Sequence, residues 1–147
     1  MISVDFYILP DDQLENLQRY SCKLAEEYWK SGSRVLIQTD SSDDSQSLDS
    51  LLWNIRDESF IPHGIATLEP VDQQQPILIS HQKINDNNFQ LVINLSSRPA
   101  DVSNDELSIK EILNQNEQRK QSGRQNYKTY RELGYTLKHH TLESING

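Results

Sequence analysis

The sequence has one cysteine and few glycines, and it lacks any long apolar run. A single cysteine, Cys22, excludes an intramolecular disulfide, which is typical of cytosolic proteins. The N-terminal run MISVDFYIL is too short and too acidic for a secretory signal. No apolar stretch approaches the roughly 20 residues that span a bilayer. We therefore expect a soluble cytosolic protein.

The few glycines form none of the loops that bind phosphate. Neither GxGxxG nor GxxxxGK[ST] occurs, and Gly32 follows an expected helix rather than preceding one. Asp40 follows an expected strand, where a nucleotide-binding fold can place a ribose-binding acid. Without the glycine loop, Asp40 is better interpreted as a loop or helix-cap residue. The sequence thus argues against a nucleotide-dependent enzyme and predicts no cofactor.

The histidines and acidic segments also form no metal or catalytic motif. His139 and His140 are adjacent, so on an extended chain their side chains point to opposite faces and chelate poorly. His63 has no nucleophile motif near it, which favours a packing or hydrogen-bonding role. Five acids stand mostly among serines in polar loops, so solvated loop charge explains them better than a Mg²⁺ site; they are Asp40, Asp43, Asp44, Asp57 and Glu58. We predict no catalytic residue and no metal ligand.

The hydrophobic pattern predicts an α/β domain. Residues 4–9 alternate like a strand, and residues 13–30 have helical spacing that ends at Gly32. Asp11 and Asp12 are the candidate N-caps of that helix. Residues 34–38 (RVLIQ) contain a continuous apolar run, as in a central buried strand. Because a strand, a helix and a buried strand follow one another, they form a βαβ unit with a right-handed crossover and a parallel sheet.

The rest of the chain extends this pattern without a repeat or a second domain, so residues 1–147 are expected to be one domain. The further expected elements are a polar loop over 40–47, a short helix around 48–53, a loop over 54–66, strands over 76–80 and 90–95, and a helix over 115–133 that ends at Gly134. Residues 108–113 fit either a helix or a short edge strand, and residues 135–141 fit either a loop or an edge strand. Residues from about 139 to 147 form a polar C-terminal extension.

Charge is distributed unevenly along this acidic chain. The formal net charge is −8, yet residues 118–140 hold six Lys and Arg against one Glu. This segment carries +5, so the rest of the chain carries −13. Such a protein repels phosphate at long range, which disfavours nucleic-acid binding over a broad face. A small acidic partner fits better.

Lys120, Arg124 and Lys128 form an i, i+4, i+8 ladder on the expected helix, with Arg131 close to the same face. Like charges at this spacing cost a few tenths of a kcal/mol per pair, and a bound anion would relieve them. One interpretation is a solvated helix face that balances the acidic remainder. The other is a site for an acidic peptide with an apolar anchor.

Three tyrosines lie in the same segment, at Tyr127, Tyr130 and Tyr135. They could be core residues or contacts to a peptide. They also support a rival hypothesis, in which the domain binds single-stranded nucleic acid directly and the rings stack on bases.

Four motifs in order, DFYIL, EEYWKSGSRVLI, LLWNIRDESFIPHGIA and YKTYRELGYTL, resemble the chi subunit family of bacterial DNA polymerase III. The similarity covers most of the chain apart from residues 68–76 and the C-terminal extension. It implies a Rossmann-like domain without nucleotide chemistry and a noncatalytic role in DNA replication. It further implies that the chain joins the clamp loader through the psi subunit and binds the acidic C-terminal tail of the single-stranded DNA-binding protein.

The resemblance also assigns residues to the tail site. In the family the tail is a run of aspartates that ends in Ile-Pro-Phe with a free carboxylate. Arg124 resembles the residue that takes the terminal carboxylate. The residues that would attract the aspartates are Lys120, Lys128 and Arg131, and those that would shape the pocket for the phenylalanine are Tyr127, Leu113 and Gly134.

The family pattern favours a strand at residues 108–113, because it puts Leu113 at a strand end beside the helix. Two positions depart from it: Asn126 stands where a basic residue is common, and Gly123 interrupts the helical pattern just before Arg124.

A second surface in the resemblance lies in the third motif. Trp53, Phe60, Pro62 and His63 resemble positions on the side that faces psi. Two large aromatic residues near a proline-bearing loop could be hot spots of an interface. Packing of the loop onto its own domain is the alternative.

Overall fold

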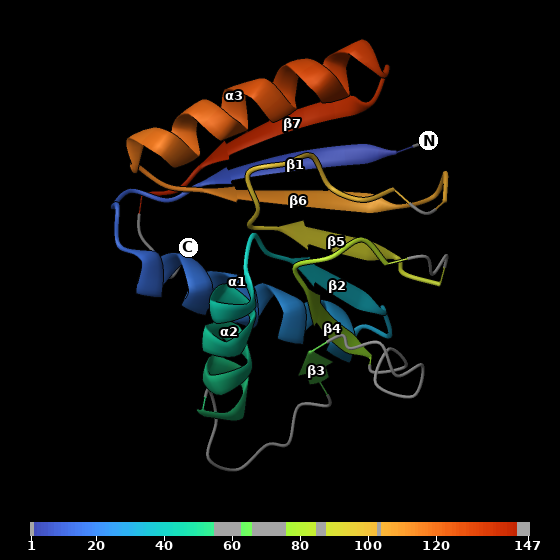
Figure 1. The fold of residues 1–147 in the computed structure, drawn as a ribbon. Helices are drawn as coiled ribbons and strands as arrows, with labels where there is room; N and C mark the ends of the chain where they lie inside the picture. Colours follow the sequence, from blue (N-terminus) through green and yellow to red (C-terminus); the bar gives the residue numbers. More distant parts are fainter. Residues whose placement is uncertain (1, 55–62, 66–75, 85–87, 103, 144–147) are drawn as a thin grey trace.

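The computed structural model describes residues 2–54, 63–65, 76–84, 88–102 and 104–143. Within them the chain forms one seven-stranded sheet in the order β3-β4-β2-β5-β6-β1-β7 (Figure 1). Every strand pairs in parallel with its neighbours. The predicted α/β class with a mostly parallel sheet is confirmed.

The strands and helices alternate along much of the chain. The strands are β1 (Ser3–Ile8), β2 (Val35–Gln38), β3 (His63–Ile65), β4 (Ile77–Ser80), β5 (Leu91–Asn94), β6 (Ser108–Leu113) and β7 (Thr136–Thr141). The helices are α1 (Leu14–Lys30), α2 (Ser42–Asn54) and α3 (Glu117–Glu132).

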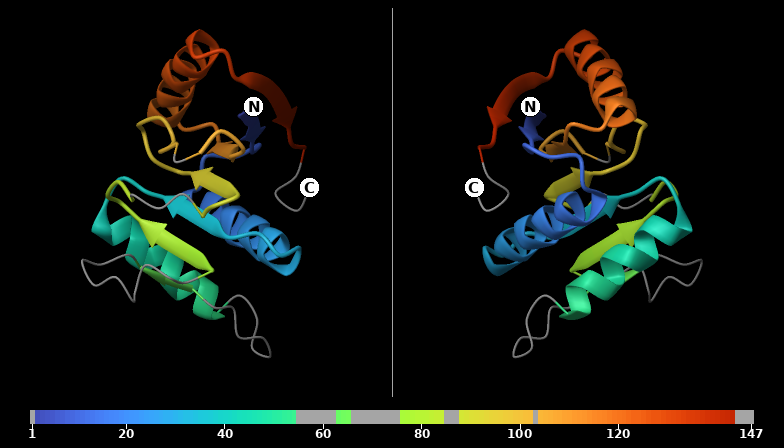
Figure 2. Two further views of the ribbon diagram at one scale, coloured as in Figure 1. Left: turned by 90° about the vertical axis from the view of Figure 1, so that its right-hand side faces the viewer. Right: turned by 90° about the vertical axis from the view of Figure 1, so that its left-hand side faces the viewer.

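Alternating side chains of the strands divide the core into two layers. One layer joins α1 and α2 to the sheet and includes Leu17, Leu48 and Ile37. The other lies on the α3 side and includes Phe6 and Tyr130. The side views of Figure 2 show α1 and α2 together and α3 apart from them. Because β1 contributes to both layers, its Phe6 and Tyr7 face different helices.

The central strands match their predicted positions. β2, β4 and β5 are buried at every position, as their continuous apolar runs indicate. Residues 108–113 form a strand, as the resemblance favoured, but β6 lies between β5 and β1 rather than at an edge. Four of its six residues are buried, including Lys110 and Glu111. Because charged residues are typical of an edge strand, the sequence did not indicate this inner position.

Two predicted loops are wrong in part. The segment over residues 40–47 was expected to be a loop, but α2 begins at Ser42. The Ser41 hydroxyl accepts a hydrogen bond from the Asp44 amide at 3.1 Å, and Asp43 and Asp44 lie in the first turn, where a helix favours negative charge. In the expected loop over 54–66, residues 63–65 form β3 beside β4. Residues 55–62 and 66 of that loop lie outside the described residues.

Helix ends follow the predicted glycines, with one correction at α1. Gly32 and Gly134 have φ values of +94° and +83°, which suit glycine at a helix C-terminus. The N-cap of α1 is Gln13 rather than an aspartate. Asp11 still supports this end, because its carboxylate accepts from the Gln13 amide at 3.3 Å and from the Asn16 side chain at 2.7 Å.

The C-terminal segment adds an edge strand to the sheet. β7 runs parallel to β1, with Phe6 opposite His139 and Tyr7 opposite His140. The segment expected to be a polar extension therefore begins inside a strand. Among the described residues, no helix is long and apolar enough to cross a membrane.

Candidate functional site

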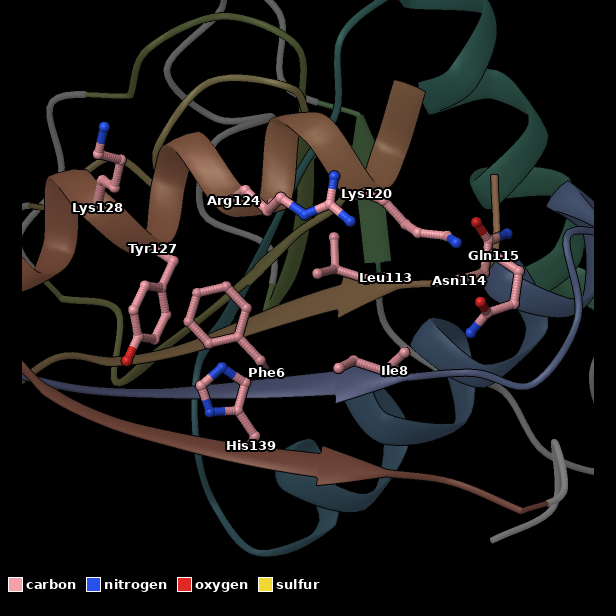
Figure 3. Close-up of a pocket in the computed structure, with 11 residues that line it drawn as sticks. Phe6, Ile8, Leu113, Asn114, Gln115, Lys120, Arg124, Tyr127, Lys128 and His139 are labelled. Atoms are coloured by element: carbon pink, nitrogen blue, oxygen red, sulfur yellow. The ribbon is translucent and has the colours of Figure 1, made fainter. Parts of the chain in front are cut away.

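A cavity of about 430 Å³ lies between α3 and the strands β1, β6 and β7 (Figure 3). Its lining comes from β1 near the N-terminus and from the consecutive elements β6, α3 and β7 near the C-terminus. The lining residues are Phe6, Ile8, Leu113, Asn114, Gln115, Lys120, Gly123, Arg124, Tyr127, Lys128 and His139.

The floor of the cavity is apolar and aromatic. Phe6 and Ile8 project from β1 on the α3 side, and Leu113 ends β6 beside them. The ring of Tyr127 lies 5.6 Å from the ring of Phe6, centroid to centroid, in a tilted arrangement. Such a surface suits an apolar or aromatic side chain of a ligand.

Gly123 brings α3 close to the strand end. A Cβ at this position would lie 2.5 Å from Leu113 Cδ1, so glycine permits a separation that alanine would not. The helix continues through Gly123 without a break from Glu117 to Glu132, and the predicted interruption is therefore wrong. The glycine instead places Arg124, the next residue, at the cavity.

The cationic ladder borders this cavity. Arg124 extends from α3 over Leu113, and Lys120 points toward Asn114 and Gln115 (Figure 3). Lys120 lies 3.4 Å from Glu117, in a largely exposed ion pair that contributes little. In the described part of the chain, neither Arg124 nor Lys128 forms an ion pair within 4.0 Å. The Lys128 side chain is exposed, and in Figure 3 it extends away from the strands.

Two predicted site residues lie outside the cavity lining. Arg131 stands over the ring of Tyr127, with its guanidinium carbon 5.9 Å from the ring centroid. Gly134 ends α3 in a left-handed conformation and is exposed. Arg131 therefore adds charge behind the cavity wall, and Gly134 shapes the helix end.

Polar contacts cap α3 and hold it on the sheet. Asn116 caps the helix by accepting from the Arg119 amide at 3.0 Å, and Arg119 donates to the Leu95 carbonyl at 2.9 Å. Tyr130 is buried, donates to Glu111 and accepts from the Ala100 amide at 2.7 Å. Burial raises the pKa of Glu111 to about 7, although hydrogen bonds from Tyr130 and Asn94 oppose this rise. The helix that carries the cations is thus held in position.

The tyrosines do not share one surface. Tyr127 lines the cavity, whereas Tyr130 is only 1% exposed. Tyr135 stacks on Tyr130 with centroids 5.9 Å apart. The rival prediction of base stacking is therefore wrong for Tyr130. Asn126, which replaces a basic residue of the family pattern, is buried and donates to the Arg98 carbonyl at 3.4 Å, so it does not face the cavity.

Several lining residues were not predicted from the sequence, namely Phe6, Ile8, Asn114, Gln115 and His139. Alternation along DFYIL does put Phe6 and Ile8 on one face of a strand. The tertiary fold decides which helix covers that face. It also decides that β7 lies beside β1. In the described residues, no three His, Cys, Asp or Glu side chains gather as a metal site would require.

The second predicted surface is described only in part. Trp53, at the end of α2, is 54% exposed, and its ring lies edge-on to His63 at 4.9 Å. His63 is buried, with Nε2 3.2 Å from Asp49 Oδ1, as its packing interpretation predicts. Phe60 and Pro62 lie outside the described residues.

Comparison with known sequences agrees with the resemblance in the motifs. Residues 1–138 match the family described as DNA polymerase III chi subunit, HolC. The chain belongs to this family. A chi-family relative from Pseudomonas aeruginosa, named DNA polymerase III subunit chi, is 30% identical over 99% of this chain and 100% of its own length. One of the same name from Escherichia coli K12 is 30% identical over 93% of this chain and 96% of its own length.

The fold of this chain also resembles that of a solved structure. The crystal structure of T4 UvsW matches with a TM-score of 0.63 and 9% identity, over 95% of this chain and 42% of that one. At this identity the likeness concerns the fold alone.

Proposed function

We propose that this chain is a noncatalytic accessory subunit of bacterial DNA polymerase III. It binds the acidic C-terminal tail of the single-stranded DNA-binding protein through the cavity beside α3. A second surface around Trp53 binds the psi subunit and so joins the chain to the clamp loader. The chain thereby links the polymerase to coated single-stranded DNA.

The observation that carries the tail proposal is Arg124 beside an apolar floor. Among the described residues Arg124 has no acidic partner, so its guanidinium is available to a ligand carboxylate. The phenylalanine that ends the tail carries its ring and the terminal carboxylate on the same residue. The cavity places an apolar floor for the ring beside a cation for the carboxylate. Lys120 and Lys128 border the same hollow, and Arg131 stands behind Tyr127. These cations attract the aspartates.

The expected free energy of tail binding favours a weak and exchangeable contact. Burial of one phenylalanine contributes roughly 2 to 3 kcal/mol, and each charge-assisted hydrogen bond to the carboxylate roughly 1.5 to 3 kcal/mol. Association costs offset much of this, which leaves about −7 to −8 kcal/mol, or micromolar affinity. Such a contact can break and re-form as replication proceeds.

A fluorescent acidic peptide that ends in Ile-Pro-Phe tests the tail site. The peptide with a free carboxylate should bind with micromolar affinity, and its C-terminal amide should bind much more weakly. Arg124→Glu should abolish binding. Lys23→Glu is the matched control, because it makes the same charge change at an exposed position of α1, away from the cavity. Equal binding of acid and amide, or equal loss in the two variants, would reject this assignment.

The psi proposal is supported by Trp53. A large aromatic side chain that is half exposed at a helix end is typical of an interface anchor. Its contact with buried His63 fixes the ring on the domain, so little freedom is lost when a partner covers it.

Coexpression with psi tests this second surface. Trp53→Ala should prevent copurification with psi while tail-peptide binding stays unchanged. Leu14→Ala is the control, since Leu14 is 49% exposed on α1. If Trp53→Ala retains psi as well as the control does, psi docks elsewhere.

A further inference from the structure

The cavity has a second wall, formed by the edge strand β7. His139 projects from this strand into the lining, and its imidazole stacks on Phe6 with centroids 5.3 Å apart and an interplanar angle of 20°. The ring of Tyr127 lies 5.1 Å away. Thus the apolar floor lies between the cations of α3 and a histidine on the opposite rim (Figure 3).

No charged group of the described chain neutralises His139. The facing residue of β1 is Phe6, which carries no charge. The groups of α3 at the cavity are Lys120, Arg124 and Lys128, with Arg131 over Tyr127, and all are cations. The imidazole is exposed, so a ligand can reach it.

The neighbours of His139 on its own strand face the other side of the sheet. His140 stacks on Tyr7 at 4.8 Å, and its Nε2 lies 2.9 Å from Asp5 Oδ1. Asp5 also pairs with Lys110 at 2.5 Å, so this carboxylate is held on the α1 side. Lys138 shares that side by alternation along the strand. Two adjacent histidines are therefore in opposite situations, one with an acid of the fold and one open to the cavity.

We infer that His139 is a second anion-binding group of the cavity, which takes a carboxylate of the acidic partner peptide upstream of its apolar anchor. This inference rests on the proposed tail binding and adds a residue that the family motifs do not include. A peptide anchored on the floor passes between two rims. One rim holds fixed positive charge, and the other holds charge only when the imidazole is protonated.

The arrangement couples binding to protonation. Carboxylates of the peptide stay ionised above about pH 5, and Lys and Arg stay charged to about pH 10, whereas histidine titrates near 6.5. A carboxylate beside His139 favours the imidazolium, so the complex takes up a proton and binding strengthens as the pH falls. Because the rim is exposed, the expected gain between pH 8 and pH 5.5 is about two- to fivefold.

Peptide titrations across pH 5.5 to 8.0 at constant ionic strength test the inference. The probe is the fluorescent acidic peptide with a free C-terminal phenylalanine, used with the full chain and with His139→Gln and His140→Gln. The wild-type chain and the His140→Gln variant should bind more tightly at low pH. His139→Gln should bind at every pH as the wild type does at pH 8.

NMR titration of the histidines gives an independent readout. The imidazole signals of His139 should shift when the peptide is added at pH 5.5, and those of His140 should stay nearly unchanged. A pH dependence that survives in His139→Gln, or no pH dependence in the wild type, would overturn the role of His139 while leaving tail binding intact. If the wild-type chain binds the peptide no better than Arg124→Glu at any pH, both the tail proposal and this inference fail.

Discussion

Gly123 on α3 lies against Leu113 at the end of β6, so closely that an added Cβ would be 2.5 Å from Leu113 Cδ1 and 3.0 Å from Cδ2. This contact sets the distance between the helix and the strand end. Leu113 is also part of the apolar floor of the cavity, and Arg124 follows Gly123 directly. One close contact therefore positions both the apolar floor and the cation.

Gly123→Ala should reduce peptide affinity severalfold with little change in stability. Alanine gains up to about 1 kcal/mol in helix propensity, which opposes the cost of displacing Leu113. Either the leucine side chain or the helix must shift to make room for the added methyl group, and because both line the cavity, we expect either shift to change the site. Peptide titration and urea unfolding measure the two effects. Unchanged affinity would mean that Leu113 moves without narrowing the cavity.

Gly134→Ala provides the contrasting control for that variant. Gly134 has φ of +83° and lies outside the cavity lining, so alanine there is strained by about 1 to 2 kcal/mol. Stability should fall while peptide affinity stays within twofold.

Arg124→Lys should separate charge from geometry. Lysine keeps the positive charge but loses the planar fork that binds a carboxylate through two hydrogen bonds. We expect roughly tenfold weaker binding of the free-acid peptide, which corresponds to about 1.4 kcal/mol, and a small effect on the amide. Lys128→Arg, at an exposed rim position, should leave both affinities nearly unchanged. Equal weakening of acid and amide by Arg124→Lys would contradict a forked contact.

Glu111 should make the protein less stable as the pH rises toward neutrality. Burial raises its pKa from an ordinary value near 4.5 to about 7. Between these values the folded state binds more protons than the unfolded state, so the stability present below about pH 4.5 is lost as the pH rises through about 7. The loss is at most about 3 kcal/mol, from 1.36 kcal/mol for each unit of pKa.

Urea unfolding of the wild type and Glu111→Gln between pH 4.5 and 8 measures this term. Glutamine keeps an oxygen that can accept from Tyr130 and Asn94, as Glu111 does, but it does not titrate. The free energy of unfolding of Glu111→Gln minus that of the wild type should therefore rise with pH. The other titrating groups contribute equally to both proteins and cancel in this difference. Parallel curves would show that Glu111 does not titrate in this range.

Cys22 should be inert to thiol reagents in the folded protein. The thiol is buried between α1 and α2, and burial raises its pKa to about 12. The thiolate is the reactive form, so labelling requires opening of the fold. We expect a rate at least about 100-fold slower than in denaturant. Lys23→Cys in a Cys22→Ala background is the exposed control on the same helix and should react at an ordinary rate. Equal rates would indicate an open core.

The central strands follow from local pattern, although their order in the sheet does not. The short apolar runs of β2, β4 and β5 predict buried strands, because a central strand of a parallel sheet is covered on both faces and buries all of its side chains. β6 was ambiguous, since its buried Lys110 and Glu111 are polar. Their partners, Asp5 on β1 and Tyr130 on α3, become neighbours only in the folded protein. α2 was missed at its start, where a serine cap competes with loop-like composition.

By itself the sequence determined the α/β class, the basic ladder of α3 and the family, because periodicity, charge and motif order are local properties of the chain. Only the tertiary structure decided that Phe6, Leu113 and His139 meet beneath that ladder. They stand on three strands that become neighbours through the order β6-β1-β7. That order is set by how the crossovers bury both faces of the sheet, a requirement that no single segment expresses.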